Sequence, residues 1–142
     1  MKSLLLVFML VFSASIFASD YQQNLETAIQ FKKEADYQKA VKYYLKALKE
    51  KENEKDLAQS LCFEISDCYL KAGDQKSAFK FIKVAVRNYG ATLDDVKSSK
   101  ILRKDFLARA KGLIDVEYED LHRAYLLKNY QFDRKEYAEL TR

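Results

Sequence analysis

The chain has 142 residues and a formal net charge of +4, and 49% of its residues are hydrophobic. Its 25 basic and 21 acidic side chains are mixed along the sequence, so this mild charge excludes a typical nucleic-acid-binding protein. Proline is absent, the chain has three glycines, and apolar residues recur every three or four positions. This spacing predicts an all-α protein.

Residues 1–18 have the layout of a secretory signal peptide. A basic start precedes nine apolar residues, Leu4 to Phe12, and a segment of small residues follows. The run is shorter than the ~20 apolar residues of a spanning helix, so we expect cleavage after Ala18 and a periplasmic or secreted domain, residues 19–142. Ile16 is bulky for a residue near a cleavage site, which leaves an uncleaved membrane anchor as the alternative.

Four helices are expected in the first part of this domain. They span 21–33, 37–50, 57–72 and the residues after the Gly73-Asp74 turn as far as Gly90. A charged run at 49–56 separates the second helix from the third and is expected to be a solvated connector. The four helices make two helical hairpins, at about 22–54 and 58–90.

Residues 91–142 are expected to form a helical cap. The sequence from Thr92 to Asp95 is close to a capping box, with aspartate in place of glutamate, and it begins the next helical segment. Gly112 is expected to end or bend that segment. An amphipathic helix is predicted at 115–130, and a short last helix is expected to start at 133–136.

Two cysteines, Cys62 and Cys68, lie on one expected helix. Six residues at a rise of 1.5 Å place them roughly 9 Å apart, beyond the ~7 Å limit for a disulfide. We therefore predict two free thiols that are small core residues. The alternative is a reactive thiol, but nothing in the sequence places the one histidine, His122, near either cysteine.

The stretch 35–48, ADYQKAVKYYLKAL, returns 38 residues later as GDQKSAFKFIKVAV, 73–86. Each copy keeps two alanines seven positions apart, with a large residue between them. A helical hairpin needs small side chains where its two helices cross, so these alanines set the distance between the helices. A leucine at Ala40 or Ala78 should overpack this crossing and cost ~1–3 kcal/mol.

The two copies resemble the tetratricopeptide repeat, a helix-turn-helix unit that stacks into an α-solenoid. The matched repeat-packing positions are Ala28, Phe31, Ala40, Tyr44 and Ala47 in the first copy, and Ser66, Tyr69, Ala78, Ile82 and Ala85 in the second. The copies depart from the family pattern in their spacing, in the tryptophan position of the first helix (Asn24 or Cys62), and in lacking the closing proline.

The resemblance implies a protein that binds an extended peptide or an amphipathic helix of another protein. The partner would lie in a concave groove lined by the first helix of each hairpin. The partner-binding residues that this register implies are Leu25, Ile29, Lys32, Phe63, Asp67 and Leu70. The alternative is that the chain's own helix at 115–130 fills the groove.

The second helix of each hairpin has a basic side. These residues are Lys39, Lys42, Lys46 and Lys49 in the first hairpin, and Lys76, Lys80, Lys83 and Arg87 in the second. One interpretation is a charged face that is simply solvated. The other is a weak contact with an anionic membrane surface or an acidic partner.

No catalytic residue, metal ligand or cofactor site is predicted. The sequence contains no glycine-rich phosphate loop, histidine cluster, cysteine pair at metal spacing or nucleophile motif. The predicted function is therefore a non-catalytic interaction scaffold or adaptor of the bacterial cell envelope. The alternative within the same fold is a structural subunit of an envelope assembly.

Overall fold

The computed structural model describes residues 19–130, with the side chains of 109–116 and 130 left aside. The predicted signal peptide at 1–18 and the predicted last helix at 133–136 lie outside the described residues. Between residues 19 and 130 the structure contains six α-helices and no strand. The prediction of an all-α protein is therefore confirmed.

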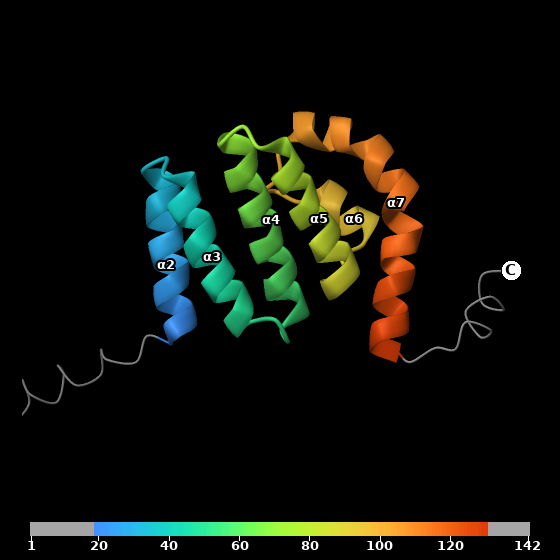
Figure 1. Ribbon diagram of the computed structural model, residues 1–142, viewed down its shortest axis with the longest axis horizontal. Coiled ribbons are helices and arrows are strands. Elements are labelled where there is room, and N and C mark those ends of the chain that lie inside the picture. The colour runs from blue at the N-terminus through green and yellow to red at the C-terminus, as the bar shows by residue number, and fades with distance from the viewer. Residues whose placement is uncertain (1–18, 131–142) are drawn as a thin grey trace, which may run out of the picture.

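The first four helices form two consecutive hairpins that stand side by side in Figure 1. They are α2 (Asp20–Lys33), α3 (Tyr37–Glu50), α4 (Lys55–Lys71) and α5 (Gln75–Tyr89). Aspartate begins the second helix of each hairpin. The Asp36 side chain accepts a hydrogen bond from the Lys39 amide at 3.2 Å, and Asp74 accepts one from the Ser77 amide at 3.0 Å. These side chains satisfy amides that the first turn of a helix leaves free.

The turns of the two hairpins use the same left-handed backbone position. Ala35 occupies it in the first hairpin with φ of 60°, and Gly73 occupies it in the second with φ of 82°. An alanine is strained there because its Cβ approaches the carbonyl oxygen, whereas glycine has no Cβ.

The small residues of the repeat lie where the helices of each hairpin meet, and all six have no solvent exposure. They are Ala28, Ala40 and Ala47 in the first hairpin, and Ser66, Ala78 and Ala85 in the second. The Ser66 hydroxyl donates to the Ala78 carbonyl oxygen at 2.9 Å, which satisfies the one buried polar group among them. Phe31 stacks on Tyr43 with ring centroids 5.6 Å apart, and Tyr69 stacks on Phe81 at 5.8 Å.

The chain continues into α6 (Leu93–Ser98) and α7 (Lys104–Tyr130). Thr92 and Asp95 form the predicted capping box, since each side chain accepts from the other residue's backbone amide. Gly112 does not end α7, which runs through it. Figure 1 shows that α7 changes direction along its length and then descends beside α5 and α6.

The second half of α7 is held against the end of α5. A Cβ built on Gly90 would lie 2.5 Å from Cζ of Tyr125, so the Tyr125 ring of α7 packs directly on the backbone at the α5 C-terminus and would have to shift for a larger residue. Gly90 also has φ of 72°, a left-handed conformation that suits glycine at a helix end. Among the described helices, none is long and apolar enough to cross a membrane.

Candidate partner-binding face on α2 and α4

The six predicted groove residues fall into three environments. Ile29 is 38% exposed and Leu25 is partly exposed, so both α2 side chains are accessible. Lys32 and Asp67 are bonded to each other. Phe63 is buried at 6% exposure, and Leu70 is partly buried against the core.

The polar part of the face is an ion cluster that joins the two hairpins. Nζ of Lys32 on α2 lies 2.6 Å from Oε2 of Glu64 and 2.6 Å from Oδ2 of Asp67, both on α4. Nζ of Lys71 lies 2.9 Å from the same Asp67 oxygen. The Tyr44 hydroxyl donates to Glu64 at 3.4 Å. The cluster fixes the position of α2 relative to α4.

Because the charged side chains of this cluster are largely buried, each one needs its ion-pair partner to remain stable. The Asp67 side chain is only 4% exposed and the Lys32 side chain 18%, so either charge left alone would be poorly solvated. Desolvation works to lower the pKa of the Lys32 ammonium, but hydrogen bonds to Asp67 and Glu64 outweigh it and raise that pKa above its ordinary value. Lys32 and Asp67 are therefore engaged within the protein and do not offer free charges to a partner.

The structure corrects the prediction that Phe63 lines an open groove. Phe63 belongs to one buried cluster with Val96, Leu102 and Phe106, which come from α6, from the segment after it and from the start of α7. Leu70 lines a recess together with Phe106. Phe63 is therefore closed off from solvent, and the start of α7 lies against α4 at Leu70, whereas the predicted helix 115–130 packs on α5 as part of α7.

The open part of the face lies between α2 and α4, and it includes residues that the repeat register did not identify. Leu57 is 37% exposed and stands seven residues before Glu64, on the same side of α4 as the partner of Lys32. Leu25, Ile29 and Leu57 therefore form an apolar surface beside the ion cluster, which we call the inner face. The seven-residue spacing would have placed Leu57 on the same side of α4 as Glu64. That inference requires knowing that Glu64 faces α2, which the sequence alone does not show.

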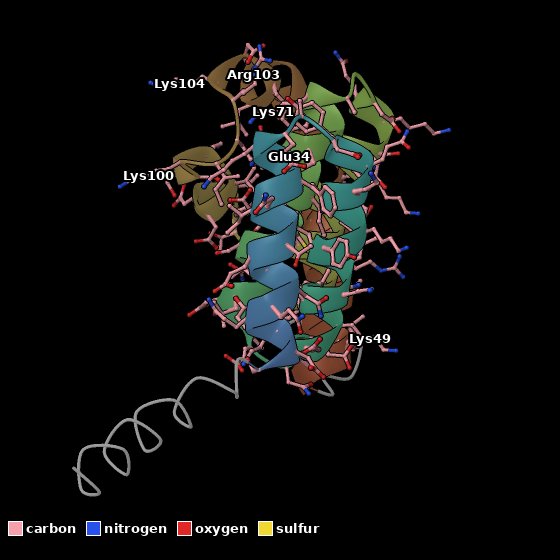
Figure 2. The ribbon with its side chains drawn as sticks, turned by 90° about the vertical axis from the view of Figure 1, so that its left-hand side faces the viewer. Glu34, Lys49, Lys71, Lys100, Arg103 and Lys104 are labelled. Atoms are coloured by element: carbon pink, nitrogen blue, oxygen red, sulfur yellow. The ribbon has the colours of Figure 1, made fainter. Side chains whose placement is uncertain are left out.

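The side-chain view gives the orientation of this region. Figure 2 looks along the row of helices from the α2 side. Lys71, Arg103 and Lys104 gather at the end of the molecule near Glu34, where α2 has ended, and Lys49 lies at the opposite end. Arg103 pairs with Asp105 at 2.8 Å, so part of this positive charge is neutralised within the chain.

Neither thiol has the environment of a nucleophile. Cys62 and Cys68 are free and buried, which confirms the prediction that they do not pair. Desolvation raises the pKa of Cys62 to about 12 and that of Cys68 to about 11. Among the side chains that the structure describes, no group of three or more potential metal ligands is present.

Comparisons of the chain with family models, with functionally described proteins and with solved structures found no match. Functional conclusions therefore depend on the geometry of the chain's own residues.

Proposed function

We propose that the chain is an exported, non-catalytic interaction scaffold of the tetratricopeptide-like kind, which binds a peptide or an amphipathic helix of another protein on the inner face. The observation that carries this proposal is the apolar surface of two exposed side chains, Ile29 and Leu57, and the half-buried Leu25, on two helices joined by ion pairs. An apolar surface of this kind suits a partner that presents apolar side chains at helical spacing.

The ion cluster supports the proposal because it preorganises the surface. Lys32 of the first hairpin forms ion pairs with Glu64 and Asp67 of the second. The helices α2 and α4 are therefore already fixed relative to each other before a partner binds. Binding to a rigid surface loses less conformational entropy than binding to a mobile one. The partner's own polar groups would then meet the rim, where Ser60 on α4 and Glu26 on α2 are exposed.

The test is site-specific photo-crosslinking of the full chain in the cells that produce it. The photoreactive residue p-benzoylphenylalanine replaces Ile29, Leu57 or Lys80, and all three positions are exposed. The proposal predicts one crosslinked protein shared by positions 29 and 57, and none at position 80 on α5. Adding Ile29→Glu should lower the crosslink at position 57 more than about 10-fold, because a carboxylate would be desolvated at the contact.

A matched Lys80→Glu variant should leave the crosslink at position 57 unchanged, and circular dichroism would establish that both variants fold. Equal crosslinking at positions 29 and 80 would contradict the proposal. A product made of two copies of this chain would instead support a structural subunit.

A further inference from the structure

The second helices of the two hairpins carry bases with almost no acids. Residues 37–49 of α3 and 75–89 of α5 contain no aspartate or glutamate. The first helices differ, since α2 and α4 hold acids such as Glu26, Glu64 and Asp67. The positive charge of the domain is therefore concentrated on α3 and α5.

The two basic helices are alike in their bases, since Lys76, Lys80 and Arg87 of α5 are also exposed and form no ion pair with a described residue. They differ in their neighbours, because α7 packs on α5. On α5, Lys83 forms an ion pair with Glu117 of α7 and also lies over the Phe79 ring, 5.5 Å from its centroid. On α3, Lys42, Lys46 and Lys49 are exposed and form no ion pair with a described residue. Lys39 pairs with Asp36 across a single turn, and both side chains remain accessible.

The exposed side of α3 also carries apolar groups between its lysines. Leu45 is 39% exposed and stands between Lys42 and Lys49 at helical spacing. Tyr43 borders this side, and Nζ of Lys46 lies 4.7 Å from its ring centroid. In Figure 2, nitrogen-tipped side chains project outward along α3, and Lys49 marks one end of that helix.

We propose that this surface, the α3 basic face of Lys39, Lys42, Leu45, Lys46 and Lys49, docks on an anionic lipid bilayer. The lysines would reach the lipid phosphates, while Leu45 enters the boundary between headgroups and acyl chains. Each unpaired lysine near an anionic membrane adds a similar electrostatic attraction, and among the described residues Lys42, Lys46 and Lys49 are in no ion pair whereas Lys39 is paired with Asp36. These three lysines on one helix side give reversible binding that depends on salt.

The apolar residues favour a bilayer over an acidic protein or nucleic acid as the occupant. Charge complementarity alone would fit any polyanion, but an exposed leucine at the border of a lysine surface gains free energy only where an apolar phase is present. The α3 basic face and the inner face use different helices and different residues. A bilayer and a protein partner are therefore separate ligands.

The experiment is vesicle flotation of the full chain with phosphatidylcholine vesicles, with and without 30% phosphatidylglycerol. The quantity measured is the difference in binding between the two vesicle types, so any contribution of the apolar N-terminal segment cancels. Lys42→Glu/Lys46→Glu/Lys49→Glu on α3 is compared with Lys76→Glu/Lys80→Glu/Arg87→Glu on α5. The two triple variants change the net charge equally.

We expect the parent to prefer anionic vesicles at low salt and to lose that preference as salt rises. The α3 variant should lose at least about 10-fold in partition to anionic vesicles, and the α5 variant should keep most of its binding. Leu45→Ser should weaken binding to anionic vesicles several-fold while leaving binding to soluble polyglutamate unchanged.

Three results would overturn the proposal. The first is equal binding of the parent to neutral and anionic vesicles. The second is an equal loss in both triple variants, which would indicate a response to net charge only. The third is tighter binding to polyglutamate than to anionic vesicles together with no effect of Leu45→Ser, which would identify an acidic polymer as the occupant.

Discussion

The α2–α3 and α4–α5 hairpins repeat the same small and aromatic positions, and their aromatic pairs stack at 5.6 and 5.8 Å. Their helices nevertheless differ greatly in burial. On α2 only Ala28 is buried, whereas α4 buries eight residues, including both cysteines and Phe63. One repeat pattern thus produces an outer helix at the start of the row and a central helix in the middle of it.

The difference arises from the helices that pack on each hairpin. The first hairpin packs on the second, but the second also packs on α7, which does not continue the repeat and which also contacts α6. The start of α7 lies against α4 at Leu70, and the later part of α7 packs on α5. The non-repeated C-terminal part therefore decides which surfaces stay open, namely the inner face and the α3 basic face.

The largest expected effect concerns the contact between α5 and α7. Gly90→Ala would place a Cβ against the Tyr125 ring and strain the left-handed backbone, so we expect a loss of about 2–4 kcal/mol in the free energy of unfolding. Gly73→Ala introduces the same strain but meets no atom within 4 Å, so it should cost only about 1–2 kcal/mol. Urea denaturation measures both, and equal losses would show that α7 does not pack closely at Gly90.

The next effect tests the link between the hairpins. Lys32→Met leaves Asp67, which is almost fully buried, with Lys71 alone, and we expect a loss of about 2 kcal/mol. Lys71→Met is the matched control. Its side chain is 37% exposed, so its loss should stay below about 1 kcal/mol. A larger loss for Lys71→Met than for Lys32→Met would contradict the assigned roles.

The free energy of unfolding should fall at alkaline pH because α4 buries two thiols. Its two thiols have pKa values raised to about 12 and about 11 from 9.0, so the unfolded state releases their protons first. Their contribution to stability is complete below pH 9 and is lost as the pH rises toward those values, by about 1 kcal/mol per thiol per pH unit. Denaturation under reducing conditions from pH 7 to 10.5 should show this decline. Cys62→Ala/Cys68→Ala should make it shallower, and an unchanged slope would refute the prediction.

The smallest effect compares the two hairpin turns and has opposite signs. Ala35→Gly should relieve the strain of the left-handed backbone and stabilise the chain by about 0.5–1 kcal/mol. Gly73→Ala should destabilise it. Thermal melts of the two variants would decide this, and a destabilising Ala35→Gly would mean that the first turn does not hold a positive φ.

Local pattern predicted the helices well. The second helix was expected at 37–50 and spans those residues. The third was expected to begin at residue 57 and begins two residues earlier, since Lys55 and Asp56 form its first turn. The capping box at Thr92 and the free cysteines also follow from spacing and side-chain chemistry. These features depend on neighbours close in sequence.

The candidate site was only partly predictable, because it depends on contacts between distant segments. Lys32 and Asp67 were both placed on the inner side, but the offset between hairpins that pairs them is a property of the packed row. Phe63 is buried in one core with Leu102 and Phe106, which lie outside the repeats and obey no periodic rule that links them to α4. The basic sides of α3 and α5 looked alike in the sequence for the same reason, because the packing of α7 on α5 is also a contact between distant segments.

Hydroxyl-radical footprinting of the full chain tests most directly the claim that Phe63 of α4 is closed off from solvent while the inner face is open. Rates of oxidation in the folded chain are divided by those in the urea-unfolded chain. The structure predicts strong protection of Phe63 and weak protection of Ile29 and Leu57, which are 38% and 37% exposed. Oxidation of Phe63 at a rate near that of the unfolded chain would contradict the account.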